Sequence, residues 1–379
     1  MTVANKKKKD CCGCNACAEI CPKHCIEMVA DNKGFLYPKI DPIACTDCRA
    51  CERVCPIDRK IRLDVPLTAF AAWSKDSRQH LASSSGGVAH VLSATIIKAG
   101  GVVYGCTSEG MHIRHIRVEN LAELTKLQGS KYVQSDVCGL YKQVKADLKK
   151  DRPVLFIGTS CQVAGLKKYI KDVPDNLYLV DLICHGVPSQ QMLHEHIAYV
   201  TSKQKIRQIS FRKGNDDVIS LAGNNFSYDA NVWEDPYKDL YIKGFVDCLI
   251  YRPSCYQCHF AQPNRVSDIT IGDFWGLRNA EKLPSESKNG ISVLLPVSNK
   301  GMELLSATKP SLYIVERSVD EAVRGNTQLR YPSIQGRRSR LFGLLYPTFP
   351  FDIAMNLAVA DHKATRKIKD FIHSLRHVC

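Results

Sequence analysis

The chain has 379 residues, of which 45% are apolar and 24% are charged, the proportions of a globular protein. This length excludes a single small module and allows one large or two ordinary domains with a core. Lysine and arginine outnumber acidic residues 52 to 38, and the formal charge of +14 would by itself suit a nucleic-acid binder.

Two nearly identical cysteine runs open the chain. The first contains Cys11, Cys14, Cys17 and Cys21-Pro22, and the second repeats its spacing with Cys45, Cys48, Cys51 and Cys55-Pro56. Two such runs are typical of a two-cluster 4Fe-4S ferredoxin, in which the fourth cysteine of each run binds the other cluster. The ligands predicted for the first cluster are Cys11, Cys14, Cys17 and Cys55. Those predicted for the second cluster are Cys45, Cys48, Cys51 and Cys21.

Zinc and disulfide bonds are the alternatives for these cysteines. A structural zinc site stops at four ligands and needs no proline, whereas each run supplies four cysteines and ends in Cys-Pro. The chain begins with MTVANKKKKD, without an apolar signal segment, and a reducing cytoplasm keeps thiols free. We therefore expect a cytoplasmic iron-sulfur protein. Cys12 and Cys25 lie outside the repeat and are assigned no role.

The predicted clusters would lower the net positive charge of the protein. A 4Fe-4S core with four thiolates carries about −2, so two or three clusters remove about 4 to 6 positive charges. Basic residues are scattered except at the two termini, and the sequence carries no nucleic-acid motif. We therefore expect no nucleic-acid partner.

From Leu67 onward the sequence alternates between predicted strands and helices. Strands are predicted at residues 68–73, 102–106, 153–158, 177–183, 206–212, 268–272, 292–297 and 312–315. Helices are predicted to begin near residues 88, 163 and 190. The expected fold class is an α+β ferredoxin-like N-terminal module followed by a larger α/β domain with a mainly parallel sheet. The expected boundaries are 1–62 for the module, 63–330 for the larger domain and 331–379 for a basic C-terminal tail, helical in part.

Residues 341–360 of this tail are mostly apolar and are flanked by basic residues. Two prolines, Pro347 and Pro350, interrupt the stretch, as do Asp352 and Asn356, so we expect no membrane-spanning helix. We expect residues 353–360 to pack on the core. Association of the tail with a membrane surface is the alternative.

Ligands of parallel sheets gather at the carboxyl ends of the strands, so the loops there are candidate sites. The run Ser84-Ser85-Gly86-Gly87 precedes a predicted helix and offers hydroxyl and amide groups to a dinucleotide pyrophosphate, although it equally suits a simple helix cap. Cys161 and Cys184 each follow a predicted strand, and Cys255-x-x-Cys258 has the spacing of cluster ligands. These four thiols suffice for a third 4Fe-4S cluster, with Cys248 as a competing ligand.

Six segments carry a resemblance to a known family. They are residues 84–87, 129–134, 158–162, 184–189, 252–258 and 267–276. Together with the cysteine runs they resemble the coenzyme F-420 hydrogenase/dehydrogenase beta-subunit family, although Ser160 stands where that family commonly has proline. The resemblance implies FAD, and it implies a third cluster at Cys161, Cys184, Cys255 and Cys258. The FAD-site candidates that it implies are Ser84, Ser85, Gly86, Gly87, Ser130, Lys131 and Thr159.

The sequence therefore predicts an FAD and iron-sulfur oxidoreductase, with its catalytic residues unassigned. A flavin takes up a hydride and releases its two electrons singly, as clusters require. The expected route joins a small-molecule hydride donor or acceptor, FAD, the third cluster and the two ferredoxin clusters, with a redox partner protein or ferredoxin at the outer end. The alternatives are a non-catalytic electron-transfer subunit of a larger redox complex and a reductase serving polysaccharide biosynthesis.

Overall fold

The computed structural model describes residue 3 and residues 6–58, 61–214, 216–279, 283 and 285–366. The end of the expected basic tail, residues 367–379, lies outside the described residues. Residues 59 and 60, which precede the expected module boundary, also lie outside them.

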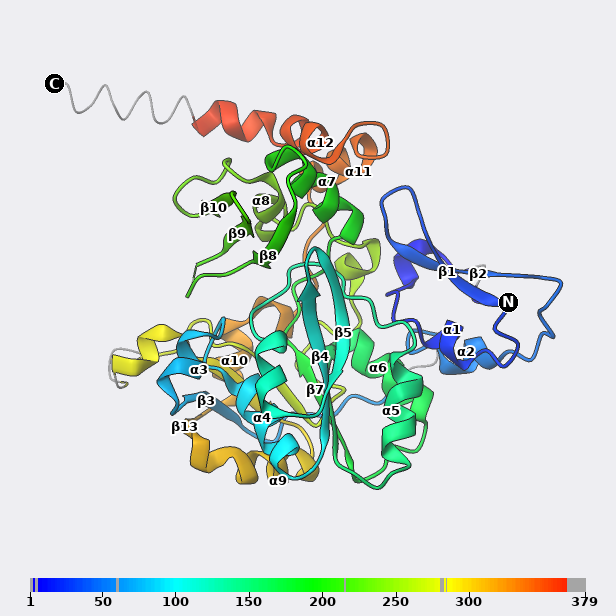
Figure 1. Ribbon diagram of the computed structural model, residues 1–379, viewed down its shortest axis with the longest axis vertical. Helices are drawn as coiled ribbons and strands as arrows, with labels where there is room; N and C mark the ends of the chain where they lie inside the picture. The colour runs from blue at the N-terminus through cyan, green and yellow to red at the C-terminus, as the bar shows by residue number, and fades with distance from the viewer. Residues whose placement is uncertain are drawn as a thin grey trace.

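Two short helices and one hairpin form the N-terminal module (Figure 1). Helix α1 (Ala16–Ile20) and helix α2 (Ala50–Val54) each begin after a residue with left-handed backbone, with φ of 67° and 57°. Strands β1 (Ile26–Ala30) and β2 (Leu36–Ile40) pair antiparallel. Each helix starts between the second and third cysteine of its run, so the sequence repeat folds into a structural repeat.

An eight-stranded sheet forms the centre of the larger domain, in the order β13-β3-β12-β11-β7-β6-β4-β5. In that order the strands span Leu312–Arg317, Ala69–Ser74, Ser292–Pro296, Ile269–Asp273, Leu177–Leu182, Val154–Thr159, Val102–Glu109 and His112–Val118. The central neighbours β11, β7, β6 and β4 pair in parallel, whereas the pairs toward both edges are antiparallel. The expected α/β class is confirmed. The mainly parallel arrangement that we expected is found at the centre of the sheet, and the antiparallel edges are an addition that the sequence did not reveal.

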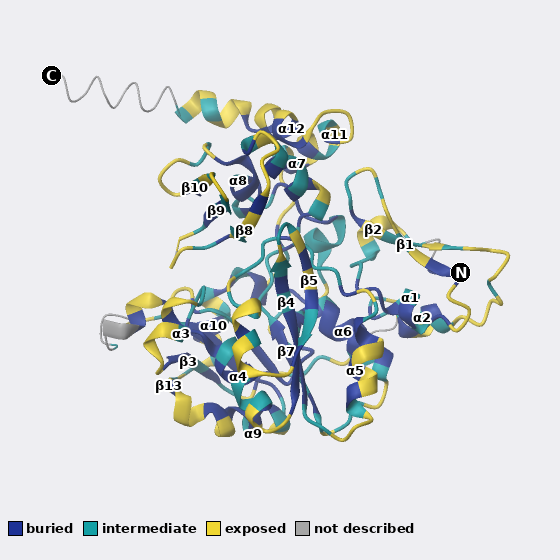
Figure 2. Cartoon of the chain, in the orientation of Figure 1, coloured by how far each residue is buried: buried dark blue, intermediate teal, exposed yellow. Residues whose placement is uncertain are grey.

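Helices cover both faces of this sheet (Figure 1). They are α3 (Ser77–Leu81), α4 (Val88–Lys98), α5 (Leu140–Leu148), α6 (Ser160–Ile170), α9 (Asn299–Thr308) and α10 (Val319–Gly325). Side chains of β6 alternate between the two faces of the sheet, as the period of a strand requires. Val154 and Phe156 pack in the cluster that includes residues of α6, whereas Leu155 packs with residues of α4. The central strands are therefore buried on both sides, as Figure 2 shows.

A second sheet forms a smaller lobe, above the main sheet in Figure 1. Its antiparallel strands are β8 (Ile206–Ser210), β9 (Val218–Gly223) and β10 (Ser227–Asn231). The helices of this lobe are α7 (Gln190–Val200), α8 (Leu240–Val246), α11 (Arg337–Leu345) and α12 (Phe351–Ala358). The strand predicted at 206–212 is thus present, but it belongs to this lobe. Its exposed face fits an antiparallel sheet rather than the buried centre of an α/β sheet.

The C-terminal apolar stretch packs on this lobe. Ala354, Met355 and Ala358 of α12 are buried in the same cluster as Tyr241 of α8. Packing on the core, which we expected for residues 353–360, is therefore observed for these side chains. Within the described residues, no helix combines the length and the apolar character needed to cross a membrane.

Candidate iron-sulfur sites

The four predicted ligands of the second cluster line one pocket with an empty volume of ≈ 370 Å³. Cys21 follows α1, Cys45 and Cys48 precede α2, and Cys51 lies in the first turn of α2. Cys25, to which the sequence assigned no role, lines the same pocket, and its sulfur lies 3.3 Å from that of Cys21. The fold therefore gathers the predicted ligands from both runs.

The predicted ligands of the first cluster lie where the module meets the larger domain. Burial raises the pKa of the Cys17 thiol, and the neighbouring Cys11 and Cys55 act in the same direction. Cys14 packs against α6, where a Cβ at Gly165 would lie 3.0 Å from its sulfur. Because glycine has no side chain, α6 can approach the cysteine run this closely.

The four cysteines predicted for the third cluster line a larger pocket of ≈ 740 Å³. Cys161 lies in the first turn of α6, and Cys184 follows β7. Cys255 lies in the 3-10 helix η4 (Pro253–Gln257), which Cys258 follows. Burial raises the pKa of Cys184 to about 12, with the nearby Cys258 as a further cause. Three segments that are distant in sequence thus bring these thiols to one site.

Two further cysteines, Cys12 and Cys248, differ in whether they line the third pocket. Cys12 lines the third pocket, and hydrogen bonds from the thiols of Cys14 and Cys161 hold its pKa well below the ordinary value. It therefore connects a predicted ligand of the first cluster with one of the third. Sequence reasoning missed Cys12 because it has no spacing partner. Cys248, the competing ligand, is not among the residues that line the pocket, and its thiol faces the Val246 carbonyl at 3.8 Å.

The chemistry of the described cysteines leaves them available as ligands. All seventeen are free thiols. No group of three or more His, Cys, Asp or Glu side chains among the described residues could hold a single metal ion. Each cysteine of a 4Fe-4S site binds its own iron atom, so cluster ligands need not converge on one point.

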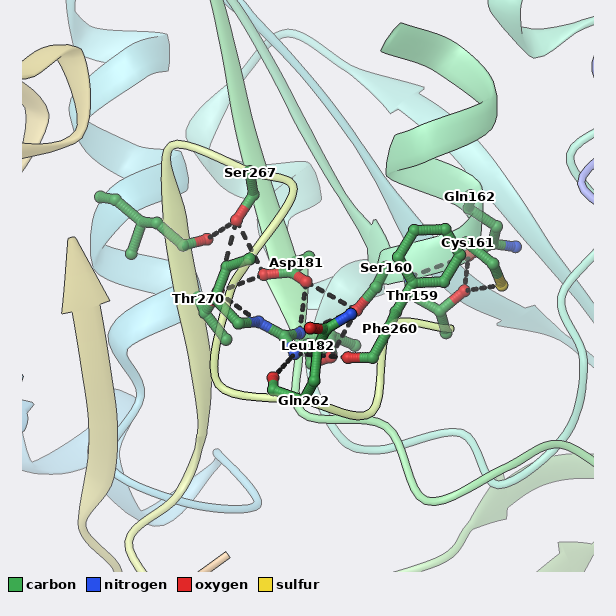
Figure 3. A network of polar contacts seen from close by, with 12 residues as sticks. Thr159, Ser160, Cys161, Gln162, Asp181, Leu182, Phe260, Gln262, Ser267 and Thr270 are labelled. Carbon is green, nitrogen blue, oxygen red and sulfur yellow. Dashed lines mark hydrogen bonds and ion pairs between the residues drawn. The ribbon is translucent and has the colours of Figure 1, made fainter. Parts of the chain in front are cut away.

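A buried polar network fixes the walls of the third pocket (Figure 3). Arg265 Nη2 donates to Asp181 Oδ2 at 2.5 Å and to Ser160 Oγ at 2.8 Å. Arg265 Nη1 donates to the Phe260 carbonyl at 2.8 Å, just after Cys258. Ser160 Oγ also donates to Asp181 Oδ2 at 2.6 Å, a bond that proline at this position would not make. The network therefore joins the start of α6, which carries Cys161, and the loop after Cys258 to strand β7.

Six of the FAD-site candidates lie around the start of α4. The Ser130 amide donates to Ser84 Oγ at 2.8 Å, so the segments at 84–87 and 129–134 meet. The Gly86 amide donates to Ser292 Oγ at 3.1 Å, and Gly87, with φ of 77°, precedes α4. A Cβ at Gly86 would lie 2.2 Å from the Ala72 carbonyl oxygen, which requires glycine there.

Lys131 is the basic side chain among the six candidates around the start of α4, and its surroundings bear on whether this region suits a phosphate-bearing cofactor. Its Nζ donates to the carbonyls of Leu127 and Gln128, at 3.1 and 2.7 Å. Burial lowers the pKa of Lys131, and none of the ion pairs among the described residues gives it a carboxylate partner. A half-buried cation without a carboxylate fits the phosphate groups of a dinucleotide.

The seventh candidate, Thr159, lies in the third pocket. It precedes α6 in a capping box with Gln162, whose Oε1 accepts from the Thr159 amide at 3.0 Å. Thr159 Oγ1 lies 3.2 Å from the sulfur of Cys161. The structure therefore places Thr159 against the predicted third cluster.

Comparison with known proteins adds two family matches. Residues 151–322 match the family that comprises the C terminus of the beta subunit in coenzyme F420 hydrogenase/dehydrogenase. Residues 10–58 match the family described as "4Fe-4S dicluster domain".

Individual relatives include subunits of redox enzymes. The chain is 22% identical over 332 residues to the F subunit of the F(420)H(2) dehydrogenase from Methanosarcina mazei, covering 84% of this chain and 90% of that protein. It is 32% identical over 85 residues to the I subunit of the NADH-quinone oxidoreductase from Pelobacter propionicus, covering 20% of this chain and 45% of that protein. One polypeptide of the F420-reducing [NiFe] hydrogenase complex from Methanosarcina barkeri has a TM-score of 0.46 and 16% identity, covering 70% of this chain and 91% of that one.

Proposed function

We propose that this chain, parts of which match the 4Fe-4S dicluster domain and the C terminus of the coenzyme F420 hydrogenase/dehydrogenase beta subunit, is an iron-sulfur flavoprotein oxidoreductase. In the proposed function, electrons pass between a hydride-exchanging substrate at FAD and the 4Fe-4S clusters. A redox partner protein or ferredoxin exchanges them at the outer end.

The observation that carries this proposal is the shared pocket of Cys161, Cys184, Cys255 and Cys258. Cys12 lies between this set and Cys14 of the first set. The second set lines its own pocket in the module, and its Cys48 is exposed. The cysteines would therefore hold clusters in the order third, first, second, from the larger domain outward.

The residues around Lys131 support a flavin near the inner end of this order. FAD, when bound, exchanges a two-electron hydride for single electrons. Lys131 would neutralise phosphate charge, and the Gly87 amide would approach the pyrophosphate at the start of α4. Thr159 lines the cysteine pocket, where it would face the third cluster.

A non-catalytic electron-transfer subunit is the second candidate. The names of the Methanosarcina mazei and Pelobacter propionicus relatives both describe subunits, which favours a chain that works within a complex. Such a chain would bind its cofactors and yet turn over no small substrate by itself.

Anaerobic purification, followed by iron and flavin counts, tests the proposal. About twelve iron atoms per chain are expected for three clusters, whereas about eight would refute the third. Absence of flavin after reconstitution would refute the flavoprotein assignment. The loaded chain is then mixed with NADH, NADPH, reduced F420 or reduced ferredoxin and an acceptor dye. Turnover by the chain alone supports the enzyme, and cofactor loading without turnover supports the non-catalytic subunit.

A further inference from the structure

Arg252 is a fully buried cation between the N-terminal module and the larger domain. It directly precedes η4, the 3-10 helix of the third pocket. Its Nε donates to the Cys11 carbonyl at 2.7 Å, its Nη2 to the Leu36 carbonyl at 2.8 Å and its Nη1 to Gln134 Oε1 at 3.0 Å. The guanidinium thus ties the first cysteine run to β2 and to the larger domain.

The charge of Arg252 has no carboxylate partner among the residues that the structure describes. Besides the neutral oxygens named above, the guanidinium carbon lies 4.3 Å from the centre of the Tyr37 ring, and Nη2 lies 3.7 Å from Cys11 Sγ. A buried cation without an anion is costly. A 4Fe-4S cluster with its thiolates carries about −2 and would supply the missing charge at Cys11.

A second cation reaches another sulfur of the same predicted set. Lys6 Nζ donates to Cys55 Sγ at 2.9 Å and to Asp58 Oδ1 at 2.7 Å, and its side chain is only 9% exposed. No lysine or arginine among the described residues makes such a bond to a sulfur of the second set. The two cations therefore distinguish the first cluster from the second.

We propose that Arg252, assisted by Lys6, raises the reduction potential of the first cluster and so keeps this buried centre reducible in the middle of the route. The inference rests on the proposed electron route. A buried cluster resists a further electron because its negative charge grows where the dielectric constant is low, and nearby cations and hydrogen bonds to sulfur offset this penalty. Arg252 would stabilise the additional negative charge of a reduced cluster held by Cys11, Cys14, Cys17 and Cys55, through its contacts at Cys11.

The test is an EPR-monitored redox titration of the whole, anaerobically purified chain. For Arg252→Gln we expect the equilibrium constant for reduction of one cluster to fall at least tenfold, which corresponds to about 59 mV for a one-electron couple. Arg252→Lys keeps the charge and should recover most of this shift. Lys6→Gln should lower the potential of the same EPR signal, because both cations contact one cysteine set.

Arg49→Gln is the matched control. Arg49 lies beside the second set, but its side chain is 57% exposed and pairs with Glu52, so its removal should leave every potential unchanged.

Each outcome decides the inference. Unchanged potentials in Arg252→Gln and Lys6→Gln at full iron content would overturn it while leaving the proposed function in place. Shifts of two different signals would overturn it as well. If Arg252→Gln assembles no clusters, Lys6→Gln decides alone, a lowered potential supporting the inference and an unchanged one overturning it. A wild-type chain without 4Fe-4S signals would instead refute the proposed function.

Discussion

Cys11 and Cys12 are neighbours in sequence, yet the fold directs them to different sites. Cys11 lies beside Cys17, in the set predicted for the first cluster, whereas Cys12 lines the pocket that holds Cys161. Spacing identified Cys11 because it opens a repeated run. No local pattern identifies Cys12, because its role depends on a helix that lies about 150 positions away along the chain.

Replacing Cys184 by alanine tests the third cluster at the scale of one residue. Cys184 lines the pocket, whereas Cys248, the matched control, directs its thiol at a carbonyl outside it. We expect about eight iron atoms per chain in Cys184→Ala and about twelve in Cys248→Ala, measured after anaerobic reconstitution. Twelve in the first variant, or eight in the second, would contradict the predicted ligands.

At the scale of elements, Arg265 and Asp181 join β7, α6 and the loop after Cys258. Both side chains are almost fully buried. Removing one partner of such a pair leaves an uncompensated charge, which costs about 3–5 kcal/mol. The network therefore makes the geometry of the third pocket depend on a single ion pair.

We expect Arg265→Met to lose about 3–5 kcal/mol of unfolding free energy, because Asp181 keeps a buried charge without its cation. The iron of the third cluster should be lost with it, since the Phe260 carbonyl also loses its donor. Urea unfolding and iron analysis measure both effects. The double variant Arg265→Met/Asp181→Asn should regain stability, and a double variant no more stable than the single one would contradict this account.

Another buried charge group holds the smaller lobe together. His196 of α7 contacts Asp239 Oδ2 at 2.7 Å, just before α8, and Asp352 Oδ1 of α12 at 2.8 Å. Burial by itself lowers the pKa of His196, but the two carboxylates outweigh it and raise the pKa to about 9. The protonated imidazole therefore links three helices.

This raised pKa predicts a stability that depends on pH. The contribution of His196 should be complete below pH of about 6.5, its unfolded pKa, and lost as pH rises through about 9. We expect His196→Gln to be less stable than wild type at pH of about 6, by up to about 3 kcal/mol, with a smaller difference at pH of about 10.

Urea unfolding followed by tryptophan fluorescence measures the pH dependence. His194→Gln is the control on the same helix, because the His194 ring bonds to the Met111 carbonyl, at 3.1 Å, and forms no ion pair with a carboxylate among the described residues. This variant should show little change with pH. A constant difference between wild type and His196→Gln across this pH range would refute the assignment.

At the scale of the whole molecule, the contact between the module and α6 sets the distance between the predicted first and third clusters. Gly165 allows this contact, because a Cβ there would lie 3.0 Å from the Cys14 sulfur and from Tyr141 Oη.

The boundaries expected at residues 62 and 330 stay predictions, as do the individual cluster ligands and the FAD-site residues.

A larger side chain at position 165 should loosen this contact. Overpacking costs about 1–3 kcal/mol, so in Gly165→Leu we expect hydrogen exchange at residues 11–17 to accelerate about tenfold or more, since about 1.4 kcal/mol is a factor of ten. Gly336→Leu is the control, because nothing lies within 4 Å of a Cβ at that position. Equal exchange in both variants would show that the contact at Gly165 does not hold the module.

The sequence by itself determined the resemblance to the family, the two-cluster repeat and the α/β class. Each depends on local information: cysteine spacing, a proline after the fourth cysteine and apolar strands between loops. The sequence also named four later cysteines, although it left Cys248 open as a competitor. Local spacing cannot choose between thiols that come from separate strands and loops.

Only the tertiary structure decided which distant residues meet. It grouped Cys161, Cys184, Cys255 and Cys258 in one pocket, added Cys12 and directed the Cys248 thiol elsewhere. It showed that the strand at 206–210 belongs to a separate lobe and that Arg252 is buried between the N-terminal module and the larger domain. These outcomes depend on how sheet, helices and module pack together. Such long-range contacts leave no periodic trace along the chain.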